Sequence, residues 1–340
     1  MENLKQLKTM YGRFFTITNP FKNNYFFKWY KGIEKYYDKP VSEMTFLEPF
    51  AGENNIIDLI QELNLSQPLN WVCFDINQPK ENKVPEFDIK IQDTIKEFPK
   101  GYKVAITNPP YLAKNKAKKI NIENFDKNYS DLYLNALDKM LNNCDFVACI
   151  IPESFITSGQ YHERLYCVIS LEMKMFSDTE TPVCLALFNK EKTNDFFIVR
   201  NGIDIGYYSE LKKYFSEYKT NIDWQFNDPD GLIGLYAVDN TKEASIKFLP
   251  GNQIDKNSIS HSSRSITRIS FTGFKLSDNE LLEFIKLSND LLNDYRKKTY
   301  DVFLTAFKGL RSDLKYRRRL NYKIAKNILN LAYKIFKEGK

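Results

Sequence analysis

The sequence predicts an α/β protein whose doubly wound sheet is followed by a second region of mixed, mostly helical structure. Short apolar segments at residues 45–48, 70–75 and 87–93 are typical of strands, and each ends in a carboxylate. A fourth predicted strand, at residues 102–107, runs directly into an Asn-Pro-Pro-Tyr tetrapeptide. Open α/β sheets bind ligands outside the carboxyl ends of their strands, so these four polar strand ends predict one shared site.

The first strand breaks into a short loop in the position of a cofactor loop. A helix predicted at residues 55–63 follows and completes a strand-loop-helix unit. The loop lacks the G-x-G-x-x-G pattern of dinucleotide-binding proteins and begins with an acid, which favours a ligand bearing an amine over one bearing a pyrophosphate. The loop residues are Glu48, Pro49, Phe50, Ala51 and Gly52.

The next two strand ends supply further hydrogen-bond acceptors. Asp75 ends a strand of buried character and is expected to accept both hydroxyl groups of a ribose, as an acid does in nucleotide-binding sheets. Asp93 ends the following strand and is expected to accept from an adenine amino group. With acids at successive strand ends, we favour a binding role over a purely structural one.

The tetrapeptide consists of Asn108, Pro109, Pro110 and Tyr111. The side-chain oxygen of Asn108 and the carbonyl oxygen of Pro109 can both accept hydrogen bonds from one exocyclic amino group, and Tyr111 can stack on the ring that carries it. Proline fixes φ and holds the preceding residue extended, which aims these acceptors before a substrate arrives. Taken alone, the tetrapeptide has an ordinary turn as its alternative interpretation.

In this order, the motifs of residues 11–190 resemble those of S-adenosylmethionine-dependent DNA adenine-N6 methyltransferases of type II restriction-modification systems, specifically the gamma class. In that class the cofactor and catalytic motifs precede a target-recognition domain. The resemblance implies a Rossmann-like methyltransferase sheet, and residues 130–133 and 146–155 resemble its later segments. It places the cofactor contacts at Thr16, Asn19, Glu48, Pro49, Phe50, Ala51, Gly52, Asp75, Ile76, Asp93 and Asn108.

The same resemblance implies a reaction. The cofactor would be S-adenosyl-L-methionine, and its methyl group would pass to N6 of an adenine flipped out of duplex DNA. Hydrogen bonds from the amino group to Asn108 and Pro109 would free the nitrogen lone pair, while Tyr111 and Phe176 would hold the two faces of the base. The reaction needs no metal ion and no imidazole base, which suits a chain with only two histidines.

We expect double-stranded DNA as the partner, a restriction endonuclease as a companion in the same system, and a monomer. Two other interpretations stay open. Methyltransferases that act on RNA or on a protein amide can use the same tetrapeptide or a close variant. A non-catalytic DNA-binding modification subunit is the second, although intact Asn108 and Tyr111 argue against it.

Composition bounds the class of protein. The 340 residues contain 43% hydrophobic and 15% aromatic side chains, as expected for a globular chain with room for two cores. No apolar run approaches about 18 residues and the first segment carries charge, so we expect no membrane span and no secretory signal. The five cysteines lack metal-ligand spacing, which predicts free thiols in a reducing cytoplasm, without zinc or disulfides.

A polar turn near residue 195 divides the prediction into a catalytic domain, residues 1–195, and a DNA target-recognition domain, residues 196–340. A capping box opens the first helix expected in the second domain. The second domain is expected to have strands at 196–199, 234–238 and 245–249, and helices at 277–295, 302–309 and 320–335.

Positive charge is concentrated at the end of the chain. Residues 296–340 hold 14 Lys and Arg against 3 Asp and Glu, a local net charge of +11 in a chain whose total is +6. This asymmetry favours contact with a phosphate backbone, with a solvated helix face as the alternative. Residues 114–119 and 261–268 are further candidates, with a mobile loop and a polar loop as their alternatives. The predicted DNA contacts are Lys114, Lys116, Arg264, Arg268, Arg317, Arg318 and Arg319.

Overall fold

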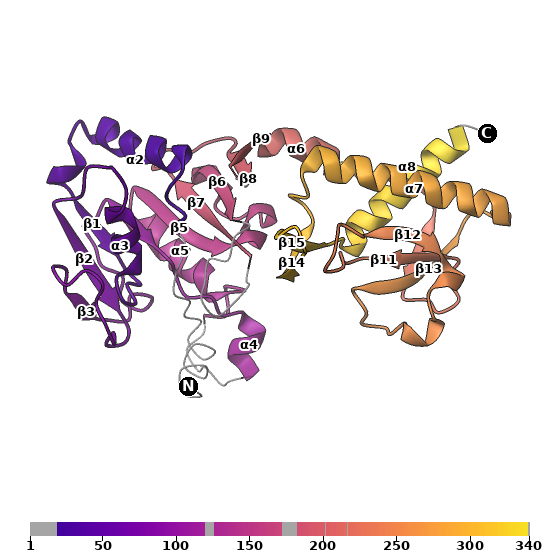
Figure 1. The fold of residues 1–340 in the computed structure, drawn as a ribbon, viewed down its shortest axis with the longest axis horizontal. Coiled ribbons are helices and arrows are strands. Elements are labelled where there is room, and N and C mark those ends of the chain that lie inside the picture. Colours follow the sequence, from indigo (N-terminus) through magenta and orange to yellow (C-terminus); the bar gives the residue numbers. More distant parts are fainter. Residues whose placement is uncertain (1–18, 120–125, 172–181, 201, 216, 339–340) are drawn as a thin grey trace. The chain divides into compact units, whose positions relative to one another are not determined.

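The computed structural model describes residues 19–119, 126–171, 182–200, 202–215 and 217–338. The chain divides into two compact units, Met1–Gly206 and Tyr207–Lys340 (Figure 1). The division expected at residue 195 falls before β8 (Phe197–Arg200) and β9 (Ile203–Tyr207), which continue the sheet of the first unit. Pairing of β8 with β6 (Leu165–Leu171) therefore moves the structural boundary along the chain.

A nine-stranded sheet forms the centre of the first unit, in the order β3-β2-β1-β4-β5-β7-β6-β8-β9. The strands from β3 to β5 pair in parallel, whereas β7 lies antiparallel between β5 and β6. The order 3-2-1-4-5 is that of a doubly wound sheet with its switch point between β1 and β4, which confirms the predicted α/β fold. The remaining strands of this sheet are β1 (Thr45–Glu48), β2 (Asn70–Asp75), β3 (Ile89–Ile91), β4 (Val104–Thr107), β5 (Phe146–Pro152) and β7 (Val183–Phe188).

Helices follow the strands on both sides of the switch point. The crossover from β1 to β2 contains α3, the crossover from β4 to β5 contains α5, and the two lead in opposite directions, so right-handed connections place them on opposite faces. Strands covered on both faces are buried throughout, as β4 and β7 are. The helical elements of this unit are α2 (Asn24–Tyr37), η1 (Val41–Glu43), α3 (Asn55–Gln61), α4 (Lys114–Lys119), α5 (Leu132–Asn143), η2 (Glu153–Thr157) and η3 (His162–Arg164).

The second unit combines a four-stranded antiparallel sheet, β10-β13-β11-β12, with a two-stranded ribbon, β14-β15. The predicted capping box is confirmed at α7, where Ser277 and Glu280 bond each other's backbone. Its elements are α6 (Tyr208–Lys212), η4 (Lys213–Phe215), β10 (Asp223–Phe226), β11 (Ile233–Tyr236), β12 (Lys247–Pro250), η5 (Gly251–Gln253), η6 (Lys256–Ser258), β13 (Ile266–Thr272), α7 (Asp278–Thr299), β14 (Thr305–Leu310), β15 (Tyr316–Arg319) and α8 (Tyr322–Glu338).

The helix predicted at residues 302–309 is wrong. Apolar residues there have near-helical spacing, but left-handed backbone at Tyr300 and Asp301 ends α7, and the chain continues into β14. The ladder to β15 supplies the hydrogen bonds, and Gly309, at φ 91°, lies where the register shifts. Periodicity along one segment could not reveal this pairing, because the partner strand lies beyond a turn.

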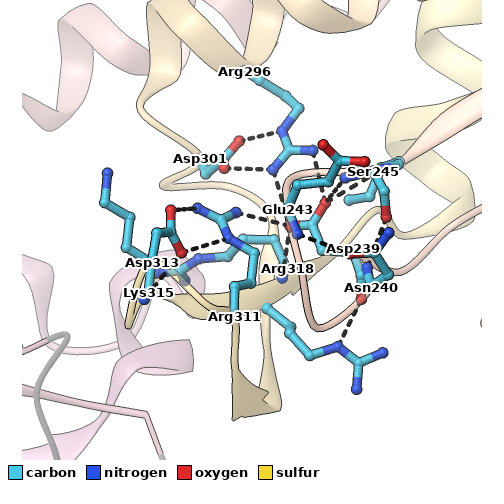
Figure 2. Close-up of polar contacts among 12 residues, drawn as sticks. Asp239, Asn240, Glu243, Ser245, Arg296, Asp301, Arg311, Asp313, Lys315 and Arg318 are labelled. Carbon is cyan, nitrogen blue, oxygen red and sulfur yellow. Dashed lines mark hydrogen bonds and ion pairs between the residues drawn. The ribbon is translucent and has the colours of Figure 1, made fainter.

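A buried carboxylate, Asp239, ties the ribbon to α7 (Figure 2). Its side chain is 0% exposed and accepts from the guanidinium of Arg296 at 3.0 and 3.1 Å and from that of Arg311 at 3.4 Å. The backbone N–H groups of Ser245 and Arg318 also donate to it, at 2.8 and 3.1 Å. Burial acts to raise the pKa of Asp239, but these arginines and N–H groups outweigh it and hold the pKa below its ordinary value.

None of the helices in the described parts of the chain combines the length and the hydropathy that crossing a bilayer requires.

Candidate functional site

The switch point of the large sheet brings the end of β1 next to the end of β4. Leu47 pairs with Ala105 in the register, so Glu48, the last residue of β1, lies beside Thr107, the last residue of β4. The hydroxyl of Thr107 donates to Oε1 of Glu48. Because Asn108 directly follows Thr107, this bond joins the predicted cofactor loop to the predicted catalytic tetrapeptide.

Glu48 is an acid held in a nearly dry environment. Its side chain is 0% exposed, and Oε1 also accepts from the backbone N–H of Phe50 at 3.1 Å. Oε2 is buried and has no hydrogen-bond partner among the described residues. Burial raises the pKa of Glu48 to about 8, although the bonds from Thr107 and Phe50 oppose the shift. A buried carboxyl oxygen without a donor is a favourable place for a cationic amine.

The loop after β1 is held against the end of β2. The N–H of Ala51 donates to the carbonyl of Phe74 at 2.8 Å, and the N–H of Gly52 donates to Oδ2 of Asp75 at 2.9 Å. Gly52 has φ 58°, the left-handed conformation that glycine adopts without strain. The hydroxyl of Thr94 donates to the carbonyl of Pro49 at 2.8 Å, so the residues after β3 also support this loop.

The structure brings Glu48 and Asp75 to one edge of the sheet, where the charge of Asp75 contributes to the raised pKa of Glu48. Oδ1 of Asp75 accepts from the N–H of Asn77 at 2.9 Å, so this acid also orders the turn after β2. Ile76 is 46% exposed beside it and offers an apolar surface. Asp93 accepts from the N–H groups of Ile95 and Lys96, both at 3.2 Å, which is also the pattern of an ordinary turn.

Tyr111 does not present a free ring face to the site. Its side chain is 8% exposed, and its ring lies edge-on to Tyr133 with centroids 6.3 Å apart. Its hydroxyl contacts Oδ1 of Asn108 and the carbonyl oxygen of Ile150, the latter at 2.6 Å. Burial raises the pKa of Tyr111 well above its ordinary value, so the phenol keeps its proton. In this conformation the hydroxyl, rather than the ring face, engages the tetrapeptide.

The segment after the tetrapeptide is anchored by residues 130–133. Oδ1 of Asp131 accepts from the N–H of Leu112 at 2.9 Å and from that of Tyr133 at 3.4 Å, which caps α5. The N–H of Lys114 donates to the carbonyl of Ser130 at 2.9 Å. These bonds give the sequence motif a physical role, because they fix the backbone that follows Tyr111.

A buried polar group that the sequence analysis missed lies after β5. Oε1 of Glu153 accepts from the hydroxyl of Ser170 at 2.6 Å and from the guanidinium of Arg200 at 2.5 Å. All three side chains are buried. Arg200 lies 47 residues from Glu153 in the sequence, on β8, and no local pattern connects them. The ion pair links residues at the ends of β5, β6 and β8.

One predicted cofactor contact, Asn19, lies away from this edge. Asn19 donates to the carbonyl of Leu59 at 2.6 Å, near the last residues of α3. A seven-residue helix is about 10 Å long, so Asn19 lies at the other end of α3 from the cofactor loop, and its predicted cofactor contact is not supported. Thr16 and Phe176 lie outside the described residues.

The predicted lysine contacts lie in a helix instead of a loop. Lys114 and Lys116 belong to α4, and Nζ of Lys114 donates to the carbonyl of Lys127 at 2.5 Å. Lys114 therefore also serves to hold the backbone at Lys127.

The predicted arginine contacts of the second unit have unequal environments. Arg268 donates to the carbonyl of Gly251 at 2.6 Å and to that of Pro229, which ties two loops together. Arg317 donates to the backbone carbonyl of Asp239 at 2.6 Å and lies over the ring of Phe307. Arg318 is only 2% exposed, so its side chain is not available to DNA in this conformation. Arg264 is exposed and Arg319 is half-buried.

No protein-family model and no curated protein matches the chain. Among solved structures, it is similar to a type I restriction-modification methyltransferase subunit from Streptococcus thermophilus, with 15% identity, a TM-score of 0.40, and coverage of 58% of this chain and 50% of that one. It is also similar to a candidate class I S-adenosylmethionine-dependent methyltransferase from Listeria monocytogenes, with 12% identity, a TM-score of 0.37, and coverage of 52% of this chain and 64% of that one. A third similar structure is the DrdV–DNA complex, with 13% identity, a TM-score of 0.39, and coverage of 58% of this chain and 29% of that one. The chain thus spans about half the length of the Streptococcus subunit.

Proposed function

We propose that this protein is a site-specific DNA methyltransferase that transfers a methyl group from S-adenosyl-L-methionine to N6 of an adenine flipped out of duplex DNA. One observation carries the proposal. At the switch point, the buried carboxyl group of Glu48, whose Oε2 has no partner among the described residues, accepts a hydrogen bond from Thr107, the residue preceding Asn108. An acceptor for an amine and an acceptor for an exocyclic amino group thus lie side by side.

The residues at the end of β1 and β2 fit the proposed cofactor. S-Adenosylmethionine supplies an electrophilic methyl group on a sulfonium when it is bound. Oε2 of Glu48 fits the amino group of the methionine part, because a donor there would satisfy the buried oxygen. Asp75 fits the ribose hydroxyls, and the exposed side chain of Ile76 fits one face of the adenine ring. Asp93 remains our candidate for the adenine amino group.

Asn108 and Pro109 would hold the target amino group, and hydrogen-bond counting indicates how Asn108 is oriented. The hydroxyl of Tyr111 has one proton but touches two oxygens, Oδ1 of Asn108 and the carbonyl of Ile150. The Ile150 carbonyl can only accept. A turn of the Asn108 amide by 180° exchanges Oδ1 and Nδ2 in nearly the same space, so that Nδ2 donates to Tyr111 and Tyr111 donates to Ile150.

In the turned orientation, Oδ1 of Asn108 would point away from Tyr111. The amide oxygen then becomes the acceptor for the target amino group, and the carbonyl of Pro109 becomes the second. Two such acceptors localise the nitrogen lone pair for attack on the methyl carbon, and positioning of this kind is a large part of catalysis without a metal or strong base. Stacking of the base on Tyr111 would require its ring to leave its buried position, and Phe176 remains the candidate for the opposite face.

The second unit is proposed as the target-recognition domain, with duplex DNA as its ligand. We further propose a monomer that modifies DNA as part of a restriction-modification system, with an endonuclease as its companion. The charge of the second unit supports a polyanionic partner, because residues 296–340 carry a net +11.

The proposal is tested by incubating the purified protein with radiolabelled S-adenosylmethionine and duplex DNA, RNA or protein in turn. N6-methyladenine in one short DNA motif, found by nucleoside analysis and sequencing, is the expected result. Asn108→Ala is the matched control, which should bind the cofactor and transfer no methyl group. Label in RNA or protein, with none in DNA, would replace the proposed substrate by the alternative one. Cofactor binding without transfer to any of them would favour a non-catalytic subunit.

A further inference from the structure

Two chain segments of the second unit that are distant in sequence meet at Tyr322, the first residue of α8. The hydroxyl of Tyr322 donates to the carbonyl of Ser263 at 2.7 Å, and its ring stacks on Phe226 with centroids 4.4 Å apart. Asn227 donates to the carbonyls of His261 and Ser263 at 3.1 and 3.2 Å. The loop before β13 is therefore fixed against the start of α8 by hydrogen bonds from two side chains.

This arrangement brings two arginines to the same place. Arg264 follows Ser263, and Arg319 ends β15 three residues before Tyr322. The bond from Tyr322 to the carbonyl of Ser263 places the backbone of Arg264 beside the segment that carries Arg319, although the two residues are far apart in the sequence. Burial raises the pKa of Tyr322, and a hydrogen bond with Thr267 and the positive charges of Arg319 and Arg264 oppose that rise.

These two arginines differ from the others of the second unit. Arg296 and Arg311 are paired with Asp239, and Arg268 is bound to backbone carbonyls. The guanidinium groups of Arg264 and Arg319 form neither an ion pair nor a hydrogen bond with the part of the chain that the structure describes. No described carboxylate neutralises their charge, and the planar, fork-like guanidinium of an arginine matches the oxygens of a phosphate.

We propose that Arg264 and Arg319, on two segments joined by the contacts of Tyr322, form a phosphodiester-binding site whose ligand is the backbone of duplex DNA. The site rests on the proposed function for its partner, and it selects two of the five arginines predicted to contact DNA. Each arginine stands on a different, internally braced segment, so the two can engage separate phosphates along a strand. Contacts of this type fix the position of a protein on DNA without reading its sequence.

The test is equilibrium binding of the full chain to a mixed-sequence duplex, measured by fluorescence anisotropy over a series of salt concentrations. The variants are Arg264→Gln, Arg319→Gln and the double substitution. Lys275→Gln is the control, because it removes the same charge from an exposed side chain beyond the opposite end of β13. Arg264→Lys and Arg319→Lys keep the charge and test whether charge alone suffices.

Each Gln variant should lower the slope of log K against log salt by about 0.9 and weaken binding roughly tenfold, equally for all sequences. The lysine variants should recover the slope, and Lys275→Gln should keep that of the unchanged protein. Thermal unfolding of each variant identifies any loss of DNA affinity that is caused by misfolding. If a Gln variant is misfolded, the salt dependence of the matching lysine variant decides whether the arginine contacts a phosphate.

An unchanged slope in the folded double variant would overturn the site. So would tighter binding to an RNA duplex of equal length, or displacement of DNA by inorganic phosphate beyond its effect on ionic strength, since either result points to another ligand. If the protein binds no duplex at all, the site is also wrong. A failure of the proposed reaction can be told apart from a failure of this site. Arginine-dependent DNA binding without methyl transfer would remove the reaction and leave this site intact.

Discussion

The hydroxyl group of Tyr111 contacts both the side-chain amide of Asn108 and the main-chain carbonyl of Ile150. An aromatic residue of the tetrapeptide thus reaches back into the sheet and touches β5 through its polar end. This links the proposed acceptor of the target amino group to one of the most deeply buried strands of the fold. In the proposed reaction Tyr111 is therefore a positioning residue, because it would act on the substrate through Asn108.

Tyr111→Phe should retain the fold and cofactor binding but lower kcat for methyl transfer by about tenfold, since it removes one hydrogen bond that orients Asn108. Tyr133→Phe is the control, because its ring lies against Tyr111 and its hydroxyl does not contact Asn108. Single-turnover kinetics with cofactor binding measured in parallel would check this. A Tyr111→Phe enzyme with an unchanged single-turnover rate would show that the hydroxyl does not orient the amide.

Glu48 should make cofactor binding depend on pH. Its pKa is about 8 in the ligand-free protein, and a cationic amine binds the deprotonated form. Affinity should therefore rise by up to tenfold per pH unit as pH increases toward 8 and then level off. Glu48→Gln should bind more weakly and without this dependence. Calorimetric titration with S-adenosylmethionine over this range, in buffers of different ionisation enthalpy, would also detect the released proton. A flat profile for the unchanged protein would contradict the assignment.

The same shift of Glu48 predicts the stability of the ligand-free protein. An ordinary Glu titrates at about 4.3 when unfolded, so between this pH and about 8 the folded state binds more protons than the unfolded state. The free energy of unfolding should fall as pH rises through this window. Glu48→Gln should reduce that fall, which urea unfolding at several pH values would measure. Loss of stability with falling pH in this window, cancelled by the substitution, would reverse the assigned direction.

Asp239→Asn should destabilise the second unit by about 3–5 kcal/mol, because it leaves two buried guanidinium groups without their shared counter-ion. The pKa of Asp239 is lowered, so its contribution is present above the ordinary pKa of an aspartate and is lost as pH falls through the folded value. The variant should therefore lose less stability in acid than the unchanged protein. Denaturant unfolding followed by Trp224 fluorescence would measure both effects.

Asp313→Asn provides the comparison for Asp239. Asp313 also pairs with Arg311, but its side chain is 46% exposed, so its loss should cost about 1 kcal/mol or less. Equal losses of unfolding free energy from the two substitutions would mean that burial does not increase the contribution of Asp239 to stability.

Arg268→Ala should reduce stability rather than change the DNA sequence that is recognised. Its guanidinium donates to the carbonyls of Gly251 and Pro229, and its removal leaves these without their donor, at a cost of about 1–3 kcal/mol. Methylation of a duplex library by the variant, beside thermal unfolding, would separate the two roles. Relaxed recognition at one base pair with normal stability would show that Arg268 reads a base instead.

Much of the first unit could be predicted because its signals are local. Glu48, Asp75 and Asn108 each stand at or just after the end of an apolar segment, and the structure places all three at the carboxyl edge of one sheet. The segment at residues 130–133 was predicted only by resemblance, and its role as a cap and anchor came from the bonds of Asp131. The partner of Glu153 could not be predicted, since Arg200 reaches it from another strand.

The second unit was harder because its charges resemble one another in the sequence. Arg317, Arg318 and Arg319 are adjacent, yet one lies over Phe307, one is buried and one stands beside Tyr322. Alternation along β15 buries Arg318 and leaves Arg317 and Arg319 half-buried, and the pairing of β15 with β14 was hidden by the helix-like spacing of residues 302–307. The surroundings of Asn19 could not be predicted for a similar reason, because they depend on its contact with the end of α3.

By itself, the sequence determined the α/β class, the strand ends and the residue types available for chemistry, because hydrophobic period and turn residues act within a few positions of the chain. The tertiary structure decided which of these groups are paired. It left one oxygen of Glu48 without a donor among the described residues, turned the hydroxyl of Tyr111 toward Asn108, and neutralised Arg296 with Asp239, whereas no described acid pairs with Arg264. Burial and long-range pairing set these outcomes, because both depend on segments that approach one another only when the chain folds.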